Sequence, residues 1–166
     1  MISCTKNERQ WFIQNIAQGL VDYLSVMKPP VPVEDLLKNP PALYESDFGV
    51  VEMNSELWDA TFARLPDQSG HVFIHTNLDS ETRRFALARE TLSALITSKH
   101  GQKMGLFELV EPHLRDSAEF FARILLAPPR LLCRFCTDEK SVMKMVADFK
   151  IPIHAASKRC EELSMA

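Results

Sequence analysis

Residues 48–76 differ in character from the sequence on either side of them, and this change limits the folds open to the chain. Residues 48–53 and 71–76 are runs of β-branched and aromatic side chains bounded by glycine, aspartate and asparagine, a pattern that predicts strands. Residues 57–65 between them fit either a strand or a helical turn. Because the flanking sequence has helical patterning, we expect an α+β fold with helices around a small sheet.

The flanking segments carry apolar residues every three or four positions, as amphipathic helices do. We expect helices over residues 7–27, 34–37, 81–98, 113–126, 138–149 and 153–163. The apolar face of the first comprises Trp11, Ile13, Ile16, Leu20, Tyr23, Leu24 and Met27. We expect this helix to end at Pro29-Pro30, since proline lacks an amide donor, and the third to be capped within residues 77–80 and to stop at Gly101.

Size and charge limit the classes of protein to consider. A chain of 166 residues with a net charge of -3 is long enough for one core, and it lacks the basic character of a protein that mainly neutralises nucleic-acid phosphates. Residues 1–8 carry no apolar signal segment, and no apolar run approaches the roughly 20 residues of a membrane-spanning helix. We therefore expect a cytoplasmic protein with no membrane partner.

Residues 84–95 look like a zinc-binding helix that has lost its histidines. In an H-E-x-x-H motif, two histidines one helical turn apart bind Zn²⁺, and the glutamate between them activates a water molecule. The corresponding positions here are Arg89, Glu90 and Ser93. The general-base position is kept, and both histidine positions are replaced.

The order of elements around this helix resembles that of the ImmA/IrrE family of zinc metallopeptidases, bacterial and phage proteins that cleave or control DNA-binding repressors. Residues 71–77 look like the family's strand ending in asparagine, and residues 81–90 like its arginine-rich entry to the zinc-binding helix. Residues 115–128 are similar to the family's second conserved block, and residues 145–159 to its C-terminal helical pair.

This resemblance implies a zincin-like fold, mostly helical, with a small sheet packed on the active-site helix. It implies one ImmA/IrrE-like domain over residues 1–166, with a peptidase-like core over about residues 1–130 and a C-terminal helical subdomain over about residues 131–166.

The resemblance also implies where a zinc site would lie. The family's first two ligands fall on Arg89 and Ser93, its third lies near Asp116, and Glu90 takes the general-base position. Arginine and serine are not usual zinc ligands, and a general base without a metal has no acidified water to deprotonate. We therefore expect no bound metal or other cofactor and assign no catalytic residue, treating Glu90 as a vestige.

Arg89 suggests what replaces the metal. Arg89 and Ser93 share one face of the predicted helix, so the guanidinium could project into the volume that zinc occupies in relatives. We expect its charge to pair with Glu90, Asp116 or Glu119, because a partly buried carboxylate needs a cation or hydrogen-bond donors. The alternative is an ordinary solvated arginine.

Other candidate ligands are weaker. His71 and His75 are four residues apart, but side chains at that spacing on a strand lie about 13 Å apart and do not chelate one metal. Cys133 and Cys136 form a single C-x-x-C without the second pair of a structural zinc site, which favours two core cysteines.

The last two predicted helices could also be interpreted as a helix-turn-helix with Lys158 and Arg159 on the second helix. The joint lacks the expected glycine, and Glu161 and Glu162 follow on the same helix. Packing of the pair against the core is favoured over direct nucleic-acid binding.

These observations predict a non-catalytic, peptidase-like protein that acts as a protein-interaction or regulatory module. The family resemblance implies a partner, which would be a helix-turn-helix transcriptional regulator. The alternatives are an active zinc peptidase with an atypical ligand set such as Asp116, Glu119 and a histidine, and a DNA-binding regulator that uses the C-terminal helices. A small-molecule sensor using the degenerate cleft stays open.

Overall fold

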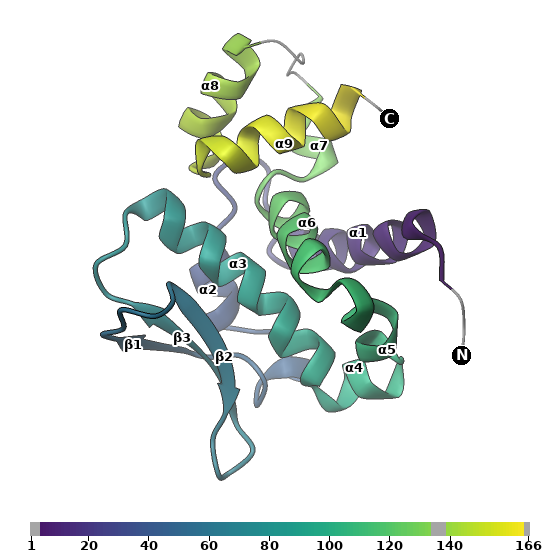
Figure 1. Ribbon diagram of the computed structural model, residues 1–166, viewed down its shortest axis with the longest axis vertical. Helices are drawn as coiled ribbons and strands as arrows, with labels where there is room; N and C mark the ends of the chain where they lie inside the picture. Colours follow the sequence, from purple (N-terminus) through teal and green to yellow (C-terminus); the bar gives the residue numbers. More distant parts are fainter. Residues whose placement is uncertain (1–3, 134–138, 165–166) are drawn as a thin grey trace.

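The computed structural model describes residues 4–133 and 139–164 and contains helices around a small sheet (Figure 1), which confirms the predicted α+β class. In chain order the elements are α1 (Lys6–Tyr23), α2 (Val33–Lys38), the 3₁₀ helix η1 (Ala42–Tyr44), β1 (Val50–Met53), β2 (Ala60–Arg64), β3 (Gly70–His75), α3 (Ser80–Thr97), α4 (Lys99–Lys103), α5 (Leu106–Val110), the 3₁₀ helix η2 (Glu111–His113), α6 (Leu114–Leu126), α7 (Pro129–Leu132), α8 (Glu139–Phe149) and α9 (Ile153–Ser164). Within the described ranges, no helix combines the length and apolar character needed to cross a bilayer.

The sheet has three strands in the order β1-β3-β2. β3 runs parallel to β1, with Val72 opposite Val50, and antiparallel to β2, with Ile74 opposite Ala60. The segment for which the sequence fits a strand or a helical turn therefore contains a strand. Because β3 is central, its Val72 and Ile74 side chains are fully buried, and β2 forms one edge of the sheet.

α3 lies between the sheet and α6 (Figure 1). Its N-cap is Asp79, whose carboxylate accepts a hydrogen bond from the Thr82 amide at 2.9 Å, within the predicted capping segment. The predicted apolar face, including Phe85 and Leu92, is buried, as the 3.6-residue period requires. The helix is thereby held on two sides and presents only a narrow partly exposed stripe.

The predicted stop of this helix at Gly101 is wrong. α3 ends at Thr97, and Gly101 lies inside the next short helix, α4. Ser98 caps α4, because its hydroxyl accepts a hydrogen bond from the Gly101 amide at 2.9 Å. A Cβ atom at Gly101 would collide with the Leu95 carbonyl oxygen, so glycine is required here for the close approach of the two backbones.

The first helix is shorter than predicted. α1 ends at Tyr23, six residues before Pro29, and the chain turns at Ser25, which has a φ of 53°. Met27 consequently lies beyond the helix, and Trp11 is 66% exposed although the periodicity placed it on the apolar face. The buried face of α1 is a narrower stripe that packs against α6.

The C-terminal helices α8 and α9 form the predicted pair, joined by a turn in which Lys150 has a φ of 54°. Arg84 of α3 reaches this turn, where its Nε donates to the Lys150 carbonyl at 3.1 Å and its Nη2 donates to the Val31 carbonyl at 2.7 Å. The His154 ring packs edge-on against Phe85 with centroids 5.5 Å apart. These contacts hold the start of α9 against the N-terminal half of α3.

Candidate functional site

The three positions of the degenerate motif form one hydrogen-bonded cluster on the partly exposed stripe of α3. Arg89 Nε lies 3.3 Å from Glu90 Oε1, and the Ser93 hydroxyl donates to Glu90 Oε2 at 3.1 Å. Both oxygens of the Glu90 carboxylate are therefore engaged by its neighbours. The Arg89 side chain is 29% exposed and the Glu90 side chain 14% exposed, so water screens their pairing less than that of a fully exposed surface ion pair.

This cluster does not fit a zinc ion. Arginine is always protonated in proteins, so its guanidinium has no lone pair for a metal and repels a second cation. The Ser93 hydroxyl donates its proton to Glu90, and Glu90 accepts from both sides. A catalytic zinc ion needs protein ligands and an open coordination position for water. Here both oxygens of Glu90 accept hydrogen bonds from Arg89 and Ser93, and these two side chains occupy the ligand positions.

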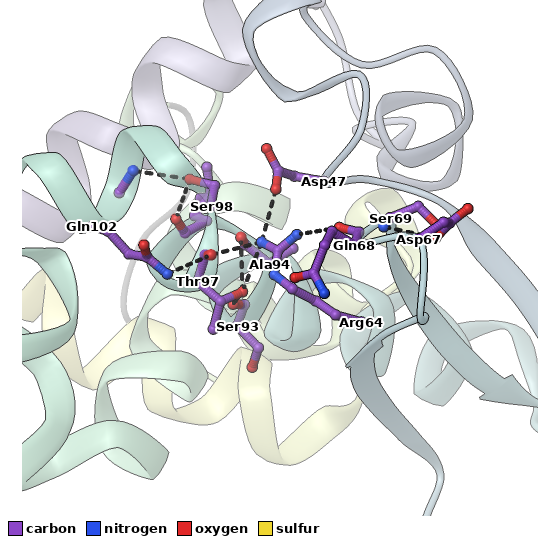
Figure 2. Close-up of polar contacts among 12 residues, drawn as sticks. Asp47, Arg64, Asp67, Gln68, Ser69, Ser93, Ala94, Thr97, Ser98 and Gln102 are labelled. Carbon is purple, nitrogen blue, oxygen red and sulfur yellow. Dashed lines mark hydrogen bonds and ion pairs between the residues drawn. The ribbon is translucent and has the colours of Figure 1, made fainter.

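Beside this cluster, the edge strand β2 is fastened to the C-terminal end of α3 by Arg64 (Figure 2). Arg64 Nη2 donates to the Thr97 carbonyl at 2.7 Å and to Asp47 Oδ1 at 2.7 Å, and Nη1 donates to the Gln68 carbonyl at 3.0 Å. Asp47 is only 5% exposed. The guanidinium thus neutralises a buried carboxylate and caps a helix C-terminus, both of which favour a cation.

The backbone of β2 has one side bonded to β3 and one side without a strand partner in the described part of the chain. The amide of His75 donates to the Asp59 carbonyl, and the amide of Leu65 donates to the Ser69 carbonyl, each at 2.8 Å. Antiparallel partners alternate between bonded and non-bonded pairs. The backbone groups of Phe62 and Arg64 consequently point away from β3.

Asp116 and Glu119, the other predicted partners of Arg89, lie elsewhere. Both line a groove between α1, α6 and α9, and Asp116 is exposed. The ion pair of Glu119 in the described structure is with Arg115, at 3.5 Å. Of the predicted charge cluster, the structure brings together Arg89 and Glu90, with Ser93. Glu90 and Ser93 are three residues apart and share a face of the helix, whereas Arg89 is the sequence neighbour of Glu90 and reaches it through its long side chain.

The histidines are dispersed, and no group of three or more His, Cys, Asp or Glu side chains in the described ranges could hold a metal. His71 and His75 lie on β3, His100 packs edge-on against Tyr44, His113 precedes α6, and His154 packs on Phe85. Cys133 is exposed rather than buried, so the prediction of a core residue is wrong for it, and Cys136 lies outside the described residues.

Sequence reasoning missed the arginine contacts that position α3. Arg83, in its first turn, donates to Glu34 of α2 and to Glu52 of β1, at distances of 2.6 to 3.2 Å. Hydrogen bonds to Glu52 and Glu34 raise the pKa of Arg83, and the Arg83 bond is the main cause that lowers the pKa of Glu34. Arg64 is 33 residues from its acceptor Thr97, and no local pattern signals such a contact.

No family model and no curated protein matches the sequence. A solved structure described as a Mycobacterium tuberculosis transcriptional regulator is similar to this one, with a TM-score of 0.63 and 13% sequence identity. The match covers 88% of this chain and 45% of that chain, so this chain spans less than half of the regulator's length. At that identity, the likeness shows a shared fold.

Proposed function

We propose that this chain is a non-catalytic, zincin-like relative of the ImmA/IrrE metallopeptidases that acts as a protein-interaction module. The observation that carries this proposal is the closed Arg89-Glu90-Ser93 cluster at the positions of the zinc-binding motif. A peptidase of this type needs a metal-bound water, and the cluster supplies neither ligands nor an open position for one. A domain of this kind without catalytic activity can still act by binding another protein on its surface.

The edge strand β2 is the surface we assign to the partner. Phe62 and Arg64 direct backbone donors and acceptors toward the open edge of the sheet, and the Arg64 side chain joins this strand to the C-terminal end of α3 at Thr97. An extended peptide can bind such an edge as an added strand, with backbone hydrogen bonds supplying affinity and neighbouring side chains supplying selectivity. Glu90, held by Arg89 and Ser93, would be one of those neighbouring side chains.

The class of partner is proposed from two resemblances. The ImmA/IrrE family acts on DNA-binding repressors, and the structure similar to this one is described as a transcriptional regulator. We therefore propose that the bound segment belongs to a helix-turn-helix repressor, and that this chain controls the repressor by binding rather than by cleavage. The net charge of -3 gives no electrostatic support for direct DNA binding.

The first test is metal content and cleavage. Protein purified without a metal-affinity tag is expected to contain no stoichiometric zinc, and a helix-turn-helix repressor that binds it is expected to remain intact on incubation with it and ZnCl₂. Cleavage that is abolished by Glu90→Gln would show an active peptidase and would overturn the proposal. Zinc bound at one equivalent per chain would also overturn it.

The second test locates the partner by amide hydrogen exchange. In the free protein, the amides of Phe62 and Arg64 are expected to exchange faster than those of Thr61 and Ala63, which face β3. Binding of the repressor is expected to slow exchange at Phe62 and Arg64 while the other two change little. Unchanged exchange of Phe62 and Arg64 in a saturated complex would refute strand addition at this edge.

A further inference from the structure

A groove lies between α1, α6 and α9, which in Figure 1 lie on the other side of α3 from the sheet. Its volume is about 1000 Å³, and a smaller cavity of about 310 Å³ adjoins it near the start of α1. Lys6, Gln10, Asp116 and Phe120 line both, so the two form one continuous depression. Volumes of about 300 to 1000 Å³ are typical of small-molecule sites.

Two arginines line the groove. Arg123 of α6 is 8% exposed and Arg159 of α9 is 5% exposed, and both bond to the carboxylate of Glu162. Arg123 Nη2 lies 2.7 Å from Glu162 Oε1, and Arg159 Nη1 lies 3.3 Å from Oε2. Arg159 Nε also donates to the Ala127 carbonyl, at the C-terminus of α6.

The charges of this group do not balance. Arg123 and Arg159 share the Glu162 carboxylate, and the Ala127 carbonyl adds only part of a negative charge at the helix end. Glu119 also lines the groove, but its ion pair is with Arg115. Burial lowers the pKa of Arg159, which reflects the cost of holding its charge away from water. A buried cation is stable only with a compensating anion, so the groove wall favours one further negative group.

The far end of the groove carries more positive charge. Lys6 and Arg9 of α1 line the smaller cavity, and neither forms an ion pair with another residue in the described ranges. Ser117 lines the same cavity and is 3% exposed, and its hydroxyl has no hydrogen-bond partner in the described structure. A buried hydroxyl without a partner is uncommon and costs free energy. Asp116 is the opposing charge at this end.

We propose that this groove binds a small molecule that carries a phosphate or carboxylate group. Arg123 and Arg159 would provide the balancing charge for one anionic group, and Lys6 and Arg9 would attract a second at the other end. Trp11 is 66% exposed along the groove and would cover an apolar or planar part of the ligand. This site is separate from the β2 edge and does not depend on the role proposed for that edge.

The fluorescence of Trp11 can be used to measure anion binding in the groove. The chain has two tryptophans, and the other, Trp58, lies in the loop before β2, so Trp58→Phe leaves Trp11 as the only reporter. Titration of this variant with inorganic pyrophosphate and, separately, with citrate, at constant ionic strength, is expected to change the Trp11 fluorescence in a saturable way. Saturation by pyrophosphate alone indicates a phosphate ligand, and saturation by citrate alone indicates a carboxylate ligand.

Three further changes in this background test the charge argument. Lys6→Gln with Arg9→Gln is expected to raise the Kd at least about tenfold, since the loss of even one charge-assisted hydrogen bond of about 1.5 kcal/mol corresponds to about a tenfold change. Asp116→Asn removes a repelling carboxylate and is expected to lower the Kd about threefold. Lys103→Gln, an exposed lysine on α4, is the control and should leave the Kd unchanged. All the replaced residues are at least partly exposed, so the fold is expected to survive.

Two results would overturn the proposal. One is the absence of a saturable signal with either anion at concentrations up to about 10 mM, which corresponds to binding weaker than about 3 kcal/mol. The other is saturable binding whose Kd is the same in the Lys6→Gln/Arg9→Gln, Asp116→Asn and Lys103→Gln variants, which would place the anion elsewhere.

Discussion

Replacement of Arg64 by methionine tests whether a single side chain fastens the edge strand to α3. The change removes the guanidinium that joins Asp47 to the Thr97 carbonyl, and methionine keeps most of the apolar stem. The Asp47 carboxylate, on a side chain that is 8% exposed, then has no cation within the contacts described for it. The end of α3 also loses a donor to its carbonyl group.

The expected loss of stability follows from burial. Breaking a fully buried ion pair by removing one partner costs about 3 to 5 kcal/mol. The side chain of Arg64 is 24% exposed, so water can partly solvate the carboxylate left behind, and we expect about 3 kcal/mol. For a chain of this size, that corresponds to a decrease in Tm of about 6 to 12 °C.

Urea unfolding followed by circular dichroism at pH 7 measures this loss. Arg115→Met is the matched control, because the Arg115–Glu119 pair has side chains 89% and 37% exposed and should cost less than about 0.5 kcal/mol. In the double variant Arg64→Met/Asp47→Asn, the loss should fall short of the summed single losses by at least about 1 kcal/mol. If Arg64→Met unfolds at the same urea concentration as Arg115→Met, the fastening role of Arg64 is refuted.

Two other predictions concern acid stability and glycine. The pKa of Glu34 in the folded protein lies below its ordinary value of 4.5, mainly because Arg83 donates hydrogen bonds to it. The ionised Glu34 therefore contributes its full share to the free energy of unfolding above pH 4.5, and this share is lost as the pH falls through the folded-state pKa. Glu34→Gln should therefore lower the urea midpoint at pH 7 and match the wild type near about pH 2; equal midpoints at both pH values would contradict this. Gly105→Ala should destabilise the fold by about 1 kcal/mol, because φ at this position is 66° and alanine is strained there. Gly19→Ala should stabilise it by about 0.5 to 1 kcal/mol, because Gly19 lies in the middle of α1 with open space around its Cα atom. Thermal unfolding in which both variants shift Tm in the same direction would refute this contrast.

The helices and the fold class were accessible from the sequence because their signals are local. α3 and α6 were predicted to within two residues, since apolar periodicity and a capping segment lie within the helices themselves or next to them. β2 was not decided, because a five-residue strand becomes distinct from a helical turn only when β3 pairs with it. Gly101 was misassigned because its role depends on a backbone contact with Leu95.

In the candidate site, too, the contacts within one helix were predictable from the sequence and the contacts between elements were not. The sequence by itself placed Arg89, Glu90 and Ser93 on one helical turn, and the Ser93–Glu90 hydrogen bond follows from their three-residue spacing. The Arg89–Glu90 bond joins adjacent residues and depends on the conformation of the arginine side chain. It did not place Asp116 and Glu119, which face α1 and α9 rather than Arg89, or Arg64, which crosses from β2 to the end of α3. Local spacing fixes contacts within an element, whereas contacts between elements depend on how α3 packs between the sheet and α6, and only the tertiary structure decides that packing.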